Sequence, residues 1–316
     1  MKLSISWIFD HINADWKKYD IEELVKKFNQ ITAETEHFHK VTFNPDNFIL
    51  VKNIKSNNGF EFYNTENNKA VELDNRTDLI DNGIYLVRKE NKTFNWATLK
   101  DLNSEKDGLL TNLWVSDAED LKGAWRKRIE IEDYVLTVDN KSITNRPDMW
   151  GHRCFAREIA AILDLELWPE ERILVNQSIK HYENKSIDSV DNPFELEIQD
   201  PNICKRFAGL YIKQIENKPS SLFIAHRLAR VDSKPIDFIV DLTNYVMLDT
   251  SQPMHAFDAD RLGSKKIIAK FATDGQTLDL LDHTQVILGS KDLVISDGSK
   301  PVSLAGIMGG AGTAVT

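Results

Sequence analysis

The chain is poor in several features that would point to particular classes of protein. It has only two cysteines in 316 residues, Cys154 and Cys204, which lie far apart without the spacing of metal ligands. A disulfide framework and a zinc site are therefore not expected, and the pattern is typical of a reducing compartment such as the cytoplasm. No apolar run approaches the length of a transmembrane helix or of a signal-peptide core, so no membrane association is expected.

The chain also lacks an excess of positive charge. Its net charge is −10, from 39 Lys and Arg against 49 Asp and Glu. Phosphate neutralisation requires clustered cations, so this balance argues against a simple nucleic-acid coat protein. The most basic local run contains Arg126, Lys127 and Arg128 beside Trp125. Such a run is most often a solvated face, and the alternative is a weak RNA contact in which Trp125 stacks on a base.

What remains is an ordinary globular composition, 41% apolar and 28% charged, in a chain long enough for two or three domains. Residues 1–40 predict one strand and one helix. Apolar residues alternate over residues 3–7, which is the strand period. Asp20 followed by Glu23 resembles a capping box ahead of an amphipathic helix.

The rest of the chain divides into four further stretches. Residues 41–135 carry short apolar runs separated by turn-rich segments, which is typical of a small β-barrel. Residues 136–170 predict a turn at Pro147 and then a helix that packs with the first segment. Residues 171–192 are polar and read as a linker, and residues 193–316 predict a final α+β domain.

Within that final domain, alternating or apolar runs predict several strands and one capped helix. The helix is expected after Ser220 and Ser221, which can accept hydrogen bonds from its first turn. The expected strands cover residues 194–198, 206–212, 238–240, 266–271 and 292–296.

The most informative stretch runs from residue 238 to 258. Its first three residues predict a buried strand, after which come the polar residues Thr243 and Asn244 and then His255. Polar side chains at the end of a buried strand are where binding sites are commonly built. Taken singly, each is more often a cap, a turn residue or a packed ring, and the same holds for Asp241 and Asp258. The ordered set favours a site.

Three motifs together resemble the beta subunit of bacterial phenylalanyl-tRNA synthetases. They occur in the order and at about the spacing of that family, and the resemblance covers residues 140–316 well and residues 1–40 loosely. The motifs are Ser-Ile-Thr-Asn-Arg-Pro-Asp at 142–148 with Ala-Arg-Glu-Ile-Ala at 156–160, Val-Asp-Leu-Thr-Asn-Tyr-Val at 240–246 running on to His-Ala-Phe-Asp at 255–258, and Leu-Ala-Gly-Ile-Met-Gly-Gly at 304–310.

The resemblance implies an α+β multidomain fold. Residues 1–40 and 136–170 would form a B1-like α+β packing domain made of an N-terminal strand–helix segment and its return. Residues 41–135 would be an inserted, degenerate OB-like β-barrel related to tRNA-binding barrels. Residues 193–316 would be a B3/B4-type editing domain that stops before the family's domain does. An expressed fragment of a longer subunit is the preferred explanation, and a truncated paralogue is the alternative.

The resemblance also implies a function. The family charges tRNA(Phe) with phenylalanine, and its B3/B4 domain hydrolyses mischarged Tyr-tRNA(Phe), because a hydrophobic pocket cannot strongly reject a substrate that merely adds a hydroxyl. We expect attack by water rather than a covalent route. The catalytic residues implied by motif match are Thr243, Asn244 and His255, and the residues lining the editing pocket are Gly306, Met308, Gly309 and Gly310.

Partners and cofactors follow from the same resemblance. The family enzyme pairs the beta chain with an alpha subunit that carries the ATP- and Mg²⁺-dependent aminoacylation site, so no cofactor is expected in this chain. tRNA(Phe) would be the nucleic-acid partner. A non-catalytic tRNA- or protein-binding scaffold that retains the B3/B4 fold is the alternative function.

Overall fold

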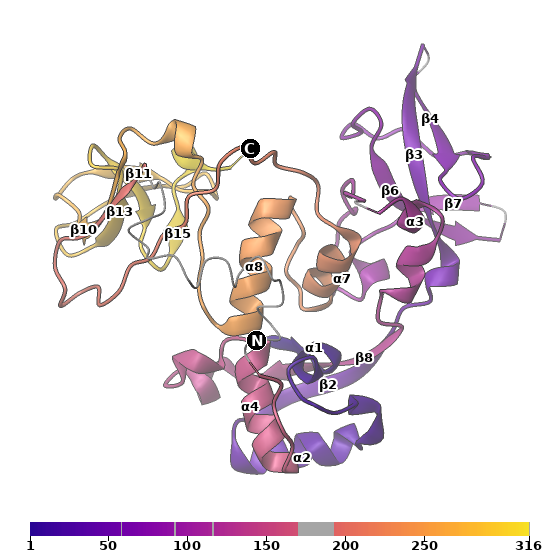
Figure 1. Cartoon of the computed structure of the whole chain (residues 1–316), viewed down its shortest axis with the longest axis horizontal. Helices are drawn as coiled ribbons and strands as arrows, with labels where there is room; N and C mark the ends of the chain where they lie inside the picture. The colour runs from indigo at the N-terminus through magenta and orange to yellow at the C-terminus, as the bar shows by residue number, and fades with distance from the viewer. Residues whose placement is uncertain (58, 92, 116, 170–192, 316) are drawn as a thin grey trace. The chain divides into compact units, whose positions relative to one another are not determined.

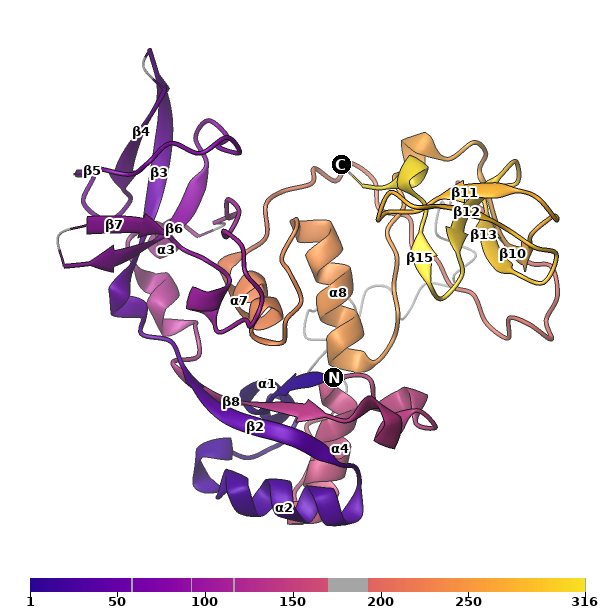
Figure 2. The same cartoon turned by 180° about the vertical axis from the view of Figure 1, so that it is seen from behind.

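The structure is a computed structural model that describes residues 1–57, 59–91, 93–115, 117–169 and 193–315. The chain divides into two compact units (Figures 1 and 2). The first comprises Met1–Ile173 and Lys218–Met254, and the second comprises Leu174–Asn217 and His255–Thr316. Residues 218–254, which the sequence assigned to the last domain, therefore pack in the first unit. The predicted linker at 171–192 lies outside the described residues.

The first unit contains a three-stranded antiparallel sheet whose central strand comes from late in the sequence. The strand order is β1-β8-β2, so the first strand pairs with β8 and not with its nearer neighbour β2. Three helices pack with this sheet around a shared apolar core. The elements are β1 (Lys2–Ser4), α1 (Ile5–Phe9), α2 (Ile21–Ile31), β2 (Thr35–Thr42), β8 (Glu132–Val138) and α4 (His152–Leu163).

The strand expected over residues 3–7 is only partly right. The strand ends at Ser4, whose side chain accepts a hydrogen bond from the Trp7 backbone N–H and so caps α1. An alternating pattern of five residues did not reveal this cap. The two longer helices agree with prediction: the Asp20 carboxylate caps α2 at the amides of Glu22 and Glu23.

The inserted segment forms a five-stranded antiparallel sheet that is open at its edges. Successive residues of β3 point to opposite faces, so Phe48 and Leu50 join one apolar cluster while Ile49 and Val51 join another. The sheet is a half barrel, and OB-like closure stays a prediction. The strands, in the order β5-β4-β3-β6-β7, are β5 (Ala70–Val71), β4 (Gly59–Asn64), β3 (Phe48–Ser56), β6 (Ile84–Glu90) and β7 (Thr93–Trp96), and the short α3 (Ala118–Leu121) follows them.

Two helices, α7 (Leu222–Arg230) and α8 (Phe238–Thr250), complete the first unit. As predicted, Ser221 caps α7 by accepting a hydrogen bond from the Ile224 amide. The strand expected at residues 238–240 is wrong, because these residues are the first turn of α8 (Figure 1). Asp237 caps this helix at the Val240 amide, and a short apolar run does not distinguish a buried strand from a buried helix.

Buried polar groups join distant segments of the first unit. The Asp133 carboxylate has no exposed surface and accepts hydrogen bonds from the hydroxyls of Ser4 and Ser6 and from the Arg230 guanidinium, which is 1% exposed. A second carboxylate, Asp249, accepts a hydrogen bond from the Trp7 indole and pairs with His11, both at 2.7 Å. These pairs fix β1 and α1 against α7 and α8.

The second unit contains a five-stranded sheet of order β15-β14-β13-β10-β9, a two-stranded hairpin and a small apolar core. Only the β9–β10 pair is parallel. The strands expected at 194–198, 266–271 and 292–296 agree with it, whereas residues 206–212 form no strand. The strands are β9 (Glu195–Ile198), β10 (Lys266–Phe271), β11 (Thr277–Asp279), β12 (Gln285–Ile287), β13 (Leu293–Ser296), β14 (Pro301–Leu304) and β15 (Met308–Gly309).

Candidate functional site

Thr243 and Asn244 lie in the middle of α8 rather than at the end of a strand. The Thr243 hydroxyl donates to the carbonyl of Val240 at 2.7 Å, so its hydrogen is used within its own helix. Its oxygen can still accept. Asn244 is half-buried on the same helix. Both residues belong to the first unit.

His255 belongs to the second unit and lies against Gly309. A Cβ atom built on Gly309 would come within 2.5 Å of His255 Nε2 and closer still to Cε1, so the ring occupies the space that a side chain would need. Phe257 meets the same ring edge-on, with centroids 4.6 Å apart and an interplanar angle of 80°. Burial lowers the pKa of His255 below its usual range, although the residue keeps solvent-exposed surface.

The glycines predicted to line the pocket have different structural reasons to be glycine. Gly306 has a φ of +71°, which favours glycine, and faces open space. Gly310 is pressed against β14, because a Cβ there would lie 2.7 Å from the Val302 carbonyl oxygen. Its N–H donates to that same oxygen at 2.8 Å and is therefore not free to bind a substrate. Met308 is half-buried against the apolar core of the unit.

The structure thus brings His255 and Gly309 into contact, with Gly310 next in sequence. It places Thr243 and Asn244 in a different unit, so the expected set is divided between the two units.

The basic run at 126–128 is largely engaged with the protein itself. Arg126 donates to the Phe48 carbonyl at 2.8 Å and pairs with Glu66, and Trp125 is only 3% exposed. Stacking of Trp125 on a base is therefore excluded in this conformation. Arg128 pairs with two carboxylates, whereas Lys127 is exposed. An RNA contact at this run stays a prediction.

Two residues of interest were not selected from the sequence. Phe257 follows His255 by two positions, and an aromatic residue so close to a candidate histidine is a usable signal. Asp241 was interpreted as a cap or turn residue, but it has no exposed surface and accepts a hydrogen bond from the Ile236 amide at 2.9 Å. Burial raises the pKa of Asp241 to about 6. Asp258 does cap a turn, at the Asp260 amide.

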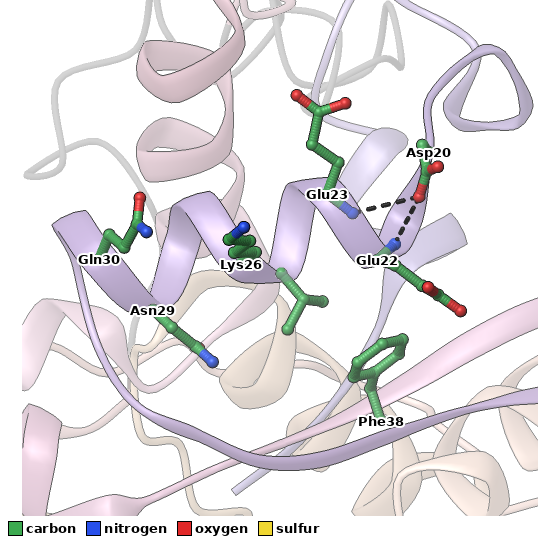
Figure 3. Close-up of a pocket in the computed structure, with 8 residues that line it drawn as sticks. Asp20, Glu22, Glu23, Lys26, Asn29, Gln30 and Phe38 are labelled. Atoms are coloured by element: carbon green, nitrogen blue, oxygen red, sulfur yellow. Dashed lines mark hydrogen bonds between the residues drawn. The ribbon is translucent and has the colours of Figure 1, made fainter.

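An open hollow of about 720 Å³ lies elsewhere, between α2 and Phe38 of β2 (Figure 3). Its lining contains none of the predicted site residues, and the Asp20 carboxylate in it is occupied by capping α2. Within the described residues, no group of three or more His, Cys, Asp and Glu side chains is arranged to hold a metal ion. Among the helices described, none is both long and apolar enough to cross a membrane.

Comparison with known proteins agrees with the motifs. Residues 203–316 match the B3/4 domain family. The matched range takes in α7 and α8 of the first unit as well as most strands of the second.

The chain is similar to phenylalanine–tRNA ligase beta subunits, as the motifs predicted. It is 38% identical to that of Solibacter usitatus over 58% of this chain and 22% of the relative. It is 39% identical to that of Carboxydothermus hydrogenoformans over 60% of this chain and 22% of the relative. For Oceanobacillus iheyensis the identity is 37% over 60% of this chain and again 22% of the relative. The matched region thus spans about a fifth of the length of these relatives.

Proposed function

We propose that this chain serves as part of a phenylalanine–tRNA ligase beta subunit in the cytoplasm. The similarity to such subunits over 58–60% of the chain carries this proposal. Its partners would be the alpha subunit and tRNA(Phe). ATP and Mg²⁺ would be bound by the alpha subunit.

We further propose that the B3/4 region hydrolyses mischarged Tyr-tRNA(Phe). The oxygen of a water molecule would bond to the ester carbonyl carbon, and the bond from that carbon to the ribose oxygen would break. His255 would orient the water and accept its proton, while the leaving ribose oxygen takes up a proton. The lowered pKa of His255 supports this role, because a neutral imidazole has a ring nitrogen that can accept.

The glycine-rich stretch would close over the amino acid. Gly306 offers open space beside a turn, Gly309 lies against His255, and Met308 precedes Gly309 on β15. Because the Gly310 amide already donates to Val302, an oxyanion would have to be held by another amide of the stretch. Thr243 and Asn244 lie on α8 of the other unit, and their catalytic role stays a prediction.

Deacylation of Tyr-tRNA(Phe) against Phe-tRNA(Phe) tests the hydrolytic proposal. We expect the chain to cleave the tyrosyl ester selectively and the His255→Ala variant to slow that cleavage by about 10²-fold or more, since general acid–base catalysis contributes on this scale. His39→Ala is the matched control, because His39 is an exposed histidine on β2. Equal rates for His255→Ala and the native chain would refute the assigned role of His255.

A non-catalytic scaffold is the second candidate function. It is favoured by large apolar side chains left exposed in the second unit, namely Leu210 at 81%, Ile212 at 56% and Ile307 at 73%. Binding of tRNA(Phe) or of the alpha subunit without cleavage of either ester would support this candidate over hydrolysis.

A further inference from the structure

The side chain of His255 is held by two groups of its own unit. Gly309 is one of them, since the imidazole lies where a Cβ of that residue would be. Phe257 contacts the same ring edge to face, with centroids 4.6 Å apart. Aromatic rings favour this arrangement because a positive ring edge meets a negative ring face.

We propose that Phe257 and Gly309 are positioning residues that hold the imidazole of His255 in one orientation. This inference rests on the proposed function, in which His255 orients a water molecule. Neither residue is assigned a contact with the ester. Phe257 acts on the reaction only through the histidine, whereas Gly309 also belongs to the glycine-rich stretch that would close over the amino acid.

The contrast among the glycines supports this assignment. A methyl group on Gly310 would collide with the backbone of β14, so that glycine serves the sheet itself. A methyl group on Gly312 would meet nothing within 4 Å. At Gly309, the three atoms nearest to an added methyl group all belong to the His255 ring. Alanine at Gly309 is therefore expected to displace the ring while leaving the strand in place.

We call the place of the His255 ring against Gly309 and Phe257 the slot. The electrostatic surroundings of His255 are consistent with it. Desolvation by burial is the cause of its lowered pKa. The carboxylate nearest in sequence, Asp258, is paired with Arg261 at 3.2 Å. A ring moved out of the slot would be better hydrated, and its pKa would rise toward the ordinary histidine value.

Side-chain NMR of His255 in the whole chain tests the proposal directly. The ring signals are assigned by their loss in His255→Ala and are then titrated in Phe257→Leu and Gly309→Ala. We expect the native ring to show contacts to the Phe257 ring and to the Gly309 α-hydrogens, and to titrate below the ordinary histidine pKa. In Phe257→Leu the ring should lose its contact with Gly309, and in Gly309→Ala it should lose its contact with Phe257. In both variants the pKa of His255 should rise.

Gly312→Ala and Phe271→Leu are the matched controls and should leave the His255 signals unchanged. Phe271 lies on β10 with 39% of its surface exposed, and alanine at Gly312 has free space. If Tyr-tRNA(Phe) hydrolysis is detected, both slot variants should lower kcat by about 10- to 100-fold with little change in KM, since small misplacements of a catalytic group act on this scale.

The NMR result decides the proposal even if no ester is cleaved, because it reports on the ring and not on turnover. Unchanged contacts and titration of His255 in both slot variants would overturn the proposal. A chain that hydrolyses nothing but shows the expected NMR changes would refute the proposed hydrolysis and leave the slot intact. If Gly309→Ala fails to fold, the decision falls to Phe257→Leu.

Discussion

The two units satisfy their buried polar groups in different ways. In the first unit, buried carboxylates pair with side chains far away in sequence, as Asp133 does with Arg230 and Asp249 does with Trp7. In the second unit, the fully buried Asp297 is satisfied largely by backbone amides, those of the nearby Ser299 and Lys300 and that of Gly263, which is 34 residues away. Burial alone would raise the pKa of Asp297, but these hydrogen bonds lower it.

The difference teaches where each unit is sensitive to substitution. Long-range charge pairs make the stability of the first unit depend on several segments at once. Loss of one partner leaves the other charge buried and unpaired. In the second unit, backbone amides replace the buried charge pairs, so its stability depends more on a small apolar core and on close backbone packing. All seven tryptophans lie in the first unit, so native tryptophan fluorescence reports its unfolding alone.

The largest expected effect is that of Asp133→Ala. The substitution leaves the Arg230 guanidinium buried without its carboxylate, which should cost the first unit about 3–5 kcal/mol in free energy of unfolding. Urea denaturation followed by tryptophan fluorescence measures the change. Asp107→Ala is the control, since that carboxylate is exposed and should matter by less than about 1 kcal/mol. A similarly small loss for Asp133→Ala would break the contrast between the units.

Acid should destabilise the first unit through its buried histidines. His152 has no exposed surface, donates to the Leu248 carbonyl and accepts from the Ser4 amide, and burial lowers its pKa to about 3. A histidine pKa that is lower in the folded state means that the unfolded chain binds more protons, so stability falls with pH below 6.5. From pH 7 to pH 5 the loss is about 2 kcal/mol. The buried His226 acts in the same direction.

Asp241 changes the stability of the first unit in the opposite direction. Its substitution therefore gives a second test of the pH dependence. Its pKa is raised to about 6 when folded, so stability from this group is gained as pH falls through 6. The gain between pH 7 and pH 5 is about 1 kcal/mol. Asp241→Asn should therefore stabilise the first unit at pH 7 and steepen its acid loss. A pH dependence unchanged by Asp241→Asn would contradict the raised pKa.

The last prediction concerns backbone packing in the second unit. Gly310→Ala should cost about 1–3 kcal/mol, because its methyl group collides with the Val302 carbonyl oxygen, whereas Gly312→Ala should stay within about 1 kcal/mol. A Phe271→Trp reporter placed in both proteins makes the second unit visible by fluorescence, once the native tryptophan signal is subtracted. Equal stability of the two alanine variants would show that β14 can shift to make room for a methyl group at Gly310.

Caps and periodicity predicted much of the fold. Asp20 and Ser221 marked the starts of α2 and α7, and alternating runs located β9, β10 and β13. The failures came where a short apolar run carries no period, as at residues 238–240, or where pairing depends on a distant strand, as at 206–212.

The candidate site could be predicted only as a set of residue types. Motif order singled out His255 and the glycines, and the structure places His255 against Gly309. Gly309 must be glycine because of the His255 ring, which lies 54 positions earlier in the chain. A pattern of neighbouring residues cannot predict such a contact. The engagement of the Gly310 amide with Val302 likewise depends on how β14 and the following turn meet.

The strand order β1-β8-β2 has a consequence for folding during synthesis. The first strand has no partner in the sheet until residues 132–138 have left the ribosome, and Trp7 meets Asp249 later still. The inserted half barrel, in contrast, is built from strands that are near neighbours in sequence. We therefore expect the inserted segment to fold first, while β1 stays unpaired until β8 has been synthesised.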